Sequence, residues 1–198
     1  MLTIYLLRHG ETDFNAQNNR YCGRTDIPVN AKGRAQAEAV RRQLEGVTFM
    51  GVYSSPLLRA YETAQIVSGR KVTKDDRLIE VDFGLWEGKT REQFTKEHPD
   101  SWEKWSADPS TNRAGVNGET GQEVVTRVDA FFEELLGTHR EGTFLVVAHN
   151  GVNRLFMAHK LGMPLANYRR IVQQNSSVTR FTLSHDEGFT LELLNSKL

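Results

Sequence analysis

Short runs of apolar residues recur along the chain, separated by segments with a helical pattern of apolar and polar positions. Six of these runs predict strands, at 3–7, 47–54, 77–81, 143–148, 177–184 and 189–194. Between most of them, apolar residues spaced three and four positions apart predict helices at 31–44, 56–67, 121–136 and 152–161. Strands that alternate with helices favour a mainly parallel sheet covered by helices on both faces.

Two parts of the chain depart from this alternation. The run Asp-Glu-Gly at 186–188 links the last two predicted strands as a hairpin, so we expect a mixed sheet. Residues 83–118 have few aliphatic runs, and we interpret them as short helices that form a lid over one end of the sheet. This segment contains three tryptophans that pack the lid, Trp86, Trp102 and Trp105. The pattern predicts a single α/β domain over 1–198, with the lid inserted at about 83–118.

Composition narrows the class of protein. Lysine plus arginine number 25, as do aspartate plus glutamate, so no overall charge attracts nucleic acid or an acidic membrane. Cys22 is the only cysteine, which excludes an internal disulfide and a cysteine-type metal cluster. The sequence has neither the pattern of a signal peptide nor a window long enough to span a membrane. We expect a cytoplasmic protein with neither nucleic acid nor a membrane as partner, and both a monomer and a homodimer stay open.

Histidines follow two of the predicted strands. Arg8, His9 and Gly10 come directly after the first strand, and His149 comes directly after the run 143–148. The carboxyl ends of parallel strands meet at one edge of the sheet, where open α/β sheets bind ligands. A lone histidine in such a place is usually a packed core residue, but the repeated arrangement favours a functional pair.

Two further residues extend this edge. Arg59 falls on the first turn of the helix after the second strand, where free backbone N–H groups favour anions. Glu80 lies near the end of the run 77–81, and a carboxylate beside cations and imidazoles is a candidate general acid and base. With Arg8, His9 and His149, these residues predict a phosphoryl-transfer site that needs no metal. The attacking imidazole must be neutral, so its other nitrogen should donate to a backbone carbonyl.

The motifs together resemble the histidine phosphatase superfamily, the phosphoglycerate mutase-like group. The resemblance begins with Leu-Arg-His-Gly-Glu-Thr at 7–12 and covers nearly the whole chain. It continues with Tyr-Ser-Ser-Pro-Leu-x-Arg-Ala at 53–60, Leu-x-Glu at 78–80, Gly-Glu-Thr at 118–120 and Val-Val-Ala-His at 146–149. Five ordered segments at these spacings are a specific signal.

The resemblance implies a three-layer α/β/α sandwich and a role for each matched residue. His9 becomes the phosphorylated nucleophile and Glu80 the proton donor, while Arg8, Arg59 and His149 form the phosphate pocket. Further positions implied to bind the substrate are Thr12, Asn15, Cys22, Gly23 and Asn150. Two of them depart from the family pattern, because many relatives have Thr-Gly at 22–23 and glycine directly after the second histidine.

Three functions fit this resemblance. We favour a phosphatase of small phosphomonoesters, because the segment 83–118 lacks the adjacent arginines of the glycolytic mutases. Candidate substrates are α-ribazole phosphate, phosphoserine, and sugar or acid phosphates. A cofactor-dependent phosphoglycerate mutase is the alternative, and a non-catalytic phosphate-binding protein comes third. No metal or other cofactor is expected. The polar run 173–177 is interpreted as a loop, with a lining of the site by its amides and hydroxyls as the alternative.

Overall fold

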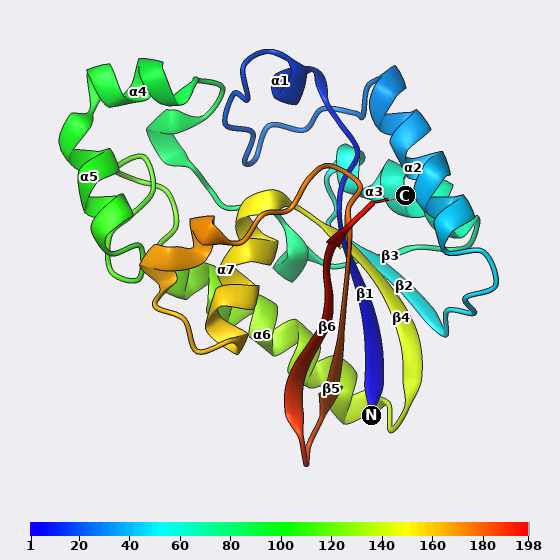
Figure 1. The fold of residues 1–198 in the computed structure, drawn as a ribbon. Coiled ribbons are helices and arrows are strands. Elements are labelled where there is room, and N and C mark those ends of the chain that lie inside the picture. Colours follow the sequence, from blue (N-terminus) through cyan, green and yellow to red (C-terminus); the bar gives the residue numbers. More distant parts are fainter. Residues whose placement is uncertain (198) are drawn as a thin grey trace.

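The computed structural model describes residues 1–197, and its centre is a six-stranded sheet in the order β3-β2-β4-β1-β5-β6 (Figure 1). The strands are β1 (Leu2–Arg8), β2 (Gly51–Ser54), β3 (Thr73–Lys74), β4 (Gly142–Ala148), β5 (Val178–Ser184) and β6 (Gly188–Ser196). The first four run parallel, whereas β5 pairs antiparallel with both β1 and β6. The expected mixed sheet is therefore confirmed.

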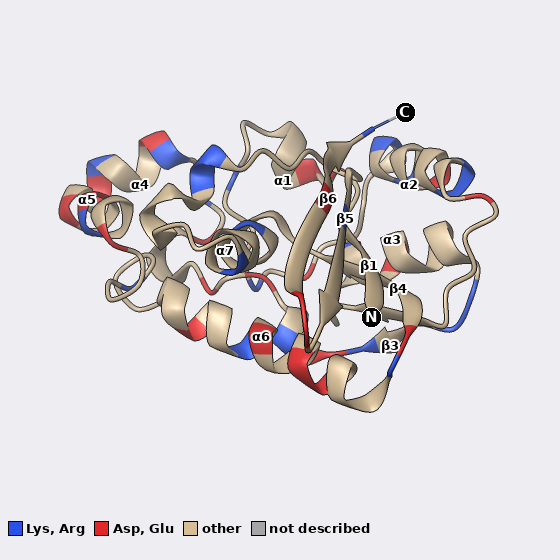
Figure 2. Cartoon of the chain, turned by 60° about the horizontal axis from the view of Figure 1, so that its bottom comes forward, with Lys and Arg blue, Asp and Glu red and all other residues tan. Residues whose placement is uncertain are grey.

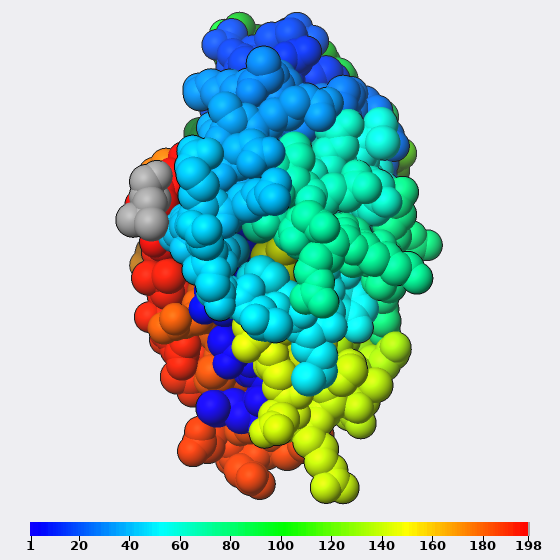
Figure 3. All heavy atoms as spheres, turned by 90° about the vertical axis from the view of Figure 1, so that its right-hand side faces the viewer, coloured from blue at the N-terminus to red at the C-terminus, as the bar shows by residue number. Residues whose placement is uncertain are grey.

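Helices cover both faces of the sheet and complete a three-layer sandwich. α2 (Ala31–Gln43) and α3 (Leu58–Ser68) pack on one face, which Figure 3 shows from outside, and α6 (Gly121–Thr138) and α7 (Asn150–Lys160) pack on the other. Along β4, Leu145 and Val147 belong to the hydrophobic cluster beneath α2 and α3. Phe144 and Val146 belong to the cluster beneath α6 and α7. A strand buried on both faces needs apolar residues at every position, which explains the continuous apolar run.

The segment 83–118 contains short helices, as the sequence predicts. They are a 3₁₀ turn (Gly84–Trp86), α4 (Arg91–Glu97) and α5 (Pro99–Ala107), and the two α-helices carry charged residues on their outer sides (Figure 2). Trp86 and Trp105 are buried, and Trp86 stacks on Phe94 with 4.7 Å between ring centroids. The tryptophans therefore pack this segment, as interpreted from the sequence, while its action as a lid stays a prediction.

The remaining helical elements are α1 (Asp13–Ala16) and two 3₁₀ turns, Asp76–Leu78 and Leu165–Arg170. None of the helices within residues 1–197 has the length and apolar composition needed to span a membrane.

The strand expected at 77–81 is wrong. The Asp75 carboxylate accepts from the backbone N–H of Arg77 at 2.9 Å and caps a 3₁₀ turn instead. Leu78 and Val81 are buried, so the apolar pattern reflects a loop that covers the core. On the side away from β4, the strand that pairs with β2 is β3, which consists of two exposed residues with no apolar pattern.

Two predicted boundaries also shift. The second strand begins at Gly51, where pairing with β4 starts, and not at 47. α3 begins at Leu58 and not at 56, because the Ser55 hydroxyl accepts from the N–H of Leu57 and holds a turn before the helix.

The carboxyl ends of β1, β2 and β4 meet at one edge of the sheet (Figure 1). Two glycines allow the start of α2 to approach the loop that follows β1. A Cβ on Gly10 would lie 2.5 Å from the Gly33 carbonyl oxygen, and a Cβ on Gly33 would lie 2.2 Å from the backbone carbonyl oxygen of Glu11. Only a residue without a side chain fits at either position, which brings α2 against the loop after His9.

Candidate active site

His9 and His149 lie together at this edge, as the repeated strand-end pattern predicts. Their ring centroids are 5.1 Å apart in an edge-on arrangement. The backbone N–H of His9 donates to the Ala148 carbonyl at 3.1 Å. Both side chains are buried, His149 completely and His9 with 5% of its surface exposed. The parallel pairing of β1 with β4 fixes this juxtaposition.

The surroundings of His9 hold its ring neutral. Its Nδ1 lies 2.7 Å from the Gly10 carbonyl oxygen, and because a carbonyl can only accept, Nδ1 carries the hydrogen. Burial lowers the pKa of His9 well below the usual value, and the positive charges of Arg59 and Arg8 lower it further. The Nε2 lone pair is therefore free to attack an electrophile, as expected for the nucleophile.

Arg8 projects into the same cavity as His9. Its Nη1 donates to the Gln173 carbonyl at 2.9 Å, whereas its buried Nε has no hydrogen-bond partner within residues 1–197. Burial is the main cause that lowers the pKa of Arg8 to about 10, so it stays charged at neutral pH.

The run 173–177 braces the end of the strand that carries His9, so its interpretation as a simple polar loop is incomplete. Asn175 Nδ2 donates to the His9 carbonyl at 3.2 Å, and the Ser176 N–H donates to the carbonyls of Arg8 and His9 at 3.0 and 3.2 Å. These bonds satisfy the backbone where β1 ends and therefore fix the direction in which Arg8 and His9 leave the strand.

Arg59 is completely buried and is held by backbone carbonyls. Its Nη1 donates to Thr25 O at 2.8 Å, and its Nη2 donates to Cys22 O and Gly23 O at 3.0 and 2.8 Å. Its Nε has no partner among the described residues. The Thr63 hydroxyl donates to Arg59 O at 2.7 Å and accepts from the Gly10 N–H at 3.0 Å, which ties α3 to the residue after His9.

The turn 22–25 that receives Arg59 is in turn held by Glu87. Its carboxylate accepts from the backbone N–H groups of Gly23, Arg24 and Thr25 at 3.0 to 3.3 Å. The Thr25 hydroxyl donates to the same carboxylate at 2.7 Å. The N–H side of the turn therefore binds Glu87 while the carbonyl side binds Arg59.

Glu80 lies against the N-terminus of α7. Its Oε1 accepts from the N–H groups of Val81 and Val152, both at 2.9 Å, and its Oε2 accepts from Gly151 N–H at 3.0 Å. A carboxylate oxygen has two lone pairs, so Oε2 keeps one position for a group in the cavity. Glu80 is thus oriented by backbone groups with one oxygen available for proton transfer.

A second carboxylate, Glu119, joins the segment that carries Glu80 to the turn 22–25 that holds Arg59. It accepts from Arg127 Nε at 2.9 Å, from Asp82 N–H at 2.8 Å and from Arg24 Nη2 at 3.0 Å. Burial is the largest single influence and would raise the pKa of Glu119, but the hydrogen bonds from Arg127 and Asp82 N–H and the charges of Arg127 and Arg24 together outweigh it and lower the pKa. Arg127 also donates to Glu80 O at 3.3 Å, so this ion pair fixes the backbone of the candidate proton donor.

His149 lies against the His9 ring, with both ring nitrogens buried and without a partner within residues 1–197. Burial lowers the pKa of His149 well below its usual value, and the charge of Arg59 lowers it further. The ring is therefore neutral in the ligand-free protein.

A cavity of about 400 Å³ opens in front of these groups. Of the ten residues expected from the sequence, those that line it are Arg8, His9, Asn15, Cys22, Glu80 and Asn150. Arg59 and His149 are completely buried and are not among the lining residues. Thr12 and Gly23 do not line it, because the Thr12 hydroxyl caps α1 through Asn15 and the Gly23 N–H is bound to Glu87.

Three of the lining residues present distinct chemistry to the cavity. Asn15 Oδ1 accepts from Thr12 N–H and Asn175 Nδ2, both at 3.1 Å, which leaves its amide N–H₂ as a donor. Asn150 Oδ1 is buried without a partner among the described residues. Burial raises the pKa of Cys22 to about 11, so its thiol is neutral and is not a nucleophile.

Sequence reasoning missed the far wall of the cavity. Its residues are Asn19, Arg20, Tyr21, Phe83, Gly151, Arg154, Tyr168 and Arg169. Arg154 follows Asn150 by four positions on α7, a spacing that places both on one helix face and could have been read from the sequence. Arg169 and Tyr21 come from segments without a motif.

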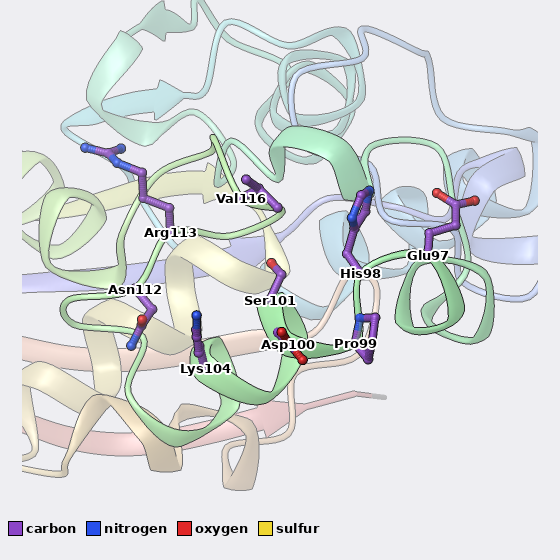
Figure 4. Close-up of a pocket in the computed structure, with 9 residues that line it drawn as sticks. All are labelled: Glu97, His98, Pro99, Asp100, Ser101, Lys104, Asn112, Arg113 and Val116. Atoms are coloured by element: carbon purple, nitrogen blue, oxygen red, sulfur yellow. The ribbon is translucent and has the colours of Figure 1, made fainter.

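A separate cavity of about 420 Å³ lies between α5 and the loop 112–116 (Figure 4). Its charges are mixed, with Glu97 and Asp100 opposite Lys104. Arg113 is already paired with Glu123 at 2.8 Å. Because its charges offset one another, this cavity does not match the anion chemistry predicted from the sequence.

Comparison with known proteins points to one family. The model of the histidine phosphatase superfamily (branch 1) matches residues 4–197. Phosphoserine phosphatase 1 of Hydrogenobacter thermophilus is 30% identical over 98% of this chain and 92% of its own length. A Salmonella paratyphi A protein named as a probable phosphoglycerate mutase GpmB is 32% identical over 91% of this chain and 84% of its own. The α-ribazole phosphatase structure from Shigella flexneri superposes with a TM-score of 0.85, at 30% identity over 98% of this chain and 96% of that one.

Proposed function

The chain belongs to branch 1 of the histidine phosphatase superfamily, and we propose that it hydrolyses small phosphomonoesters through a phosphohistidine at His9. One observation carries the proposal: Arg8 Nε, Arg59 Nε and both ring nitrogens of His149 are buried without partners within residues 1–197. A buried polar group without a partner costs about 1–3 kcal/mol. Oxygens of a phosphate group placed against His9 would accept from Arg8 Nε, Arg59 Nε and the one protonated ring nitrogen of His149, and would so offset this cost for several groups at once.

In the first step, His9 Nε2 attacks phosphorus while the bond to the ester oxygen breaks. Arg8, Arg59 and His149 hold the three equatorial oxygens as charge redistributes among them. The phosphorylated ring gains positive charge, which the Nδ1–H bond to the Gly10 carbonyl stabilises. Glu80 donates its proton to the leaving alkoxide, from the oxygen that has a free position.

In the second step, water attacks the phosphohistidine. Glu80, now ionised, takes a proton from this water as its oxygen bonds to phosphorus, and the P–N electron pair returns to His9 Nε2. Inorganic phosphate leaves and both residues regain their starting states. Asn19 and Arg20 at the cavity wall are exposed, which supports access of water to the intermediate.

The test is phosphate release in the presence of EDTA, measured with p-nitrophenyl phosphate, phosphoserine, α-ribazole phosphate and a sugar phosphate. His9→Ala should lower kcat by about 10⁴-fold or more because the nucleophile is gone. His185→Ala is the matched control, because His185 is exposed. Glu80→Gln should slow alkyl phosphates far more than p-nitrophenyl phosphate, whose leaving group needs no proton.

Each outcome bears on a different part of the proposal. Equal phosphate release by wild type and His9→Ala would refute the phosphohistidine. Loss of activity in EDTA with recovery on adding zinc or magnesium would refute a metal-independent reaction. Interconversion of 3- and 2-phosphoglycerate that needs 2,3-bisphosphoglycerate, without net phosphate release, would make the protein a mutase.

A further inference from the structure

Arg154 and Arg169 stand on the cavity wall away from the phosphate-binding groups. Both line the active-site cavity and also a neighbouring cavity of about 480 Å³ that shares Arg8 with it. They come from α7 and from the 3₁₀ turn Leu165–Arg170, which lie side by side (Figure 1). Both side chains are partly buried, and the mechanism above uses neither of them.

Within residues 1–197, the two guanidinium groups are held by a backbone carbonyl, tyrosine hydroxyls and aromatic rings, and not by carboxylates. Arg154 Nε donates to Tyr168 O at 3.2 Å, and Arg169 Nε donates to the Tyr168 hydroxyl at 3.0 Å. Arg169 Nη2 donates to the Tyr21 hydroxyl at 3.3 Å, and its guanidinium lies 4.0 Å over the Trp102 ring. These contacts fix both groups but leave most of their N–H donors available, because each guanidinium carries five.

The charges around the cavity show that these two arginines lack an anionic partner. A phosphate dianion at His9 is balanced by Arg8 and Arg59, and Glu80 is the carboxylate on this wall. Arg20, Arg154 and Arg169 then remain as positive charges without an acidic partner among the described residues, and of these Arg154 and Arg169 are partly buried whereas Arg20 is exposed. The neighbouring cavity adds Lys32 and Lys197 against Glu11, which Lys32 already neutralises at 2.8 Å. Partly buried cations of this kind favour an anion with two or more oxygens.

We propose that Arg154 and Arg169 form a subsite for a second anionic group of the substrate. This inference rests on the proposed phosphatase function and narrows its substrates to phosphomonoesters whose alcohol carries a carboxylate or a second phosphate. Arg154 lies three residues beyond Gly151, which binds Glu80, and four beyond Asn150. Three or four residues of helix rise about 5–6 Å, a span that an alcohol of three carbons bridges.

The test compares two esters that differ only in the second charge. In 3-phosphoglycerate a carboxylate stands where glycerol 3-phosphate has a hydroxymethyl group. We expect kcat/KM to favour 3-phosphoglycerate by about tenfold to a hundredfold, as for charge-assisted bonds to a fixed guanidinium. Glycerol 1,3-bisphosphate distinguishes a preference for a second phosphate from a preference for carboxylate.

Variants assign the preference to the two arginines. Arg154→Gln and Arg169→Gln should each reduce the ratio of kcat/KM between the two esters toward one, mainly through a higher KM. Arg170→Gln is the matched control, because Arg170 is exposed, adjacent in sequence and outside both cavity linings, so the ratio should stay as in wild type.

Binding measurements separate this inference from the proposed function. Calorimetric titration of the His9→Ala protein with each ester reports the subsite without turnover, and 3-phosphoglycerate should bind at least tenfold more tightly. Equal affinity and equal kcat/KM for the two esters would refute the subsite while leaving the phosphatase intact. Preferential binding without hydrolysis of any ester, p-nitrophenyl phosphate included, would refute the phosphatase and retain the subsite.

Discussion

Glu87 lines no part of the active-site cavity, yet the structure predicts that Glu87→Gln impairs catalysis. The carboxylate accepts hydrogen bonds from Gly23, Arg24 and Thr25, and the carbonyls of the same turn hold Arg59. A glutamine amide has the same shape but presents an N–H₂ group toward backbone donors, so the bonds at one oxygen are lost. The hydrogen bonds to the other oxygen remain, but their acceptor is no longer charged.

The size of the effect follows from these bonds. A hydrogen bond to a charged group contributes about 1.5–3 kcal/mol, so losing one or two of them lowers the free energy of unfolding by about 3 kcal/mol. For a chain of this size, each kcal/mol changes the melting temperature by about 2–4 °C, so we expect a decrease of about 6–12 °C. A displacement of about 1 Å in a substrate-positioning group lowers the rate by about 10²-fold, which is the loss in kcat that we expect.

Thermal unfolding and kcat for p-nitrophenyl phosphate check both numbers on the same samples. Glu92→Gln is the matched control from the same segment, because Glu92 is exposed and bonded only to Lys96, and both readings should stay at wild type. Thr25→Ala removes one bond of the set and should give a smaller change in the same direction. A lower melting temperature with wild-type kcat would refute the claim that this turn positions Arg59, and no change in either would refute the reasoning entirely.

Three further predictions concern the groups at the site. Because burial lowers the pKa of both His9 and His149, the unfolded chain binds protons below pH 6.5 that the folded chain does not. Stability to urea should therefore fall with decreasing pH by about 1.4 kcal/mol per pH unit for each histidine, and a slope in His149→Gln equal to wild type would contradict this. Inorganic phosphate at a hundredfold excess over its Kd should stabilise the protein by about 2.7 kcal/mol in a thermal-shift assay, unlike chloride at equal ionic strength. Since the pKa of Cys22 is raised from 9.0 to about 11, iodoacetamide should alkylate its thiol about a hundredfold more slowly than a free thiol, and an equal rate would exclude a buried, neutral thiol.

The sequence predicts an element well where its apolar periodicity matches both the burial of its side chains and the hydrogen bonding of its backbone. In α6, Val124, Val128 and Phe131 form one apolar face over its whole length, and a capping box at Thr120 marks its start. The strand predicted at 77–81 is wrong for a physical reason. Its apolar positions are buried as in a strand, but the backbone bonds to Arg127 and to a local cap. Periodicity reports burial and cannot tell which partner the backbone finds.

The same distinction explains which site residues the sequence could place. His9 and His149 follow strands, so parallel pairing alone brings them together. Arg59 also needs the carbonyls of a turn more than 30 residues earlier, and Arg169 comes from a 3₁₀ turn whose position depends on tertiary packing. No spacing within either segment encodes those contacts.

The arrangement of carboxylates around the candidate site shows how a chain without net charge can present a positively charged cavity. Arg8 and Arg59 donate to backbone carbonyls, which fix a guanidinium without cancelling its charge. Glu87 instead accepts from the backbone of the turn 22–25 that holds Arg59. Glu119 pairs with Arg127 and Arg24 and accepts from the backbone N–H of Asp82, two residues after Glu80. A carboxylate paired directly with Arg8 or Arg59 would compete with the phosphate for the same donors. By acting through the backbone, these carboxylates contribute rigidity while the cavity keeps its positive potential, and low local polarity strengthens that potential.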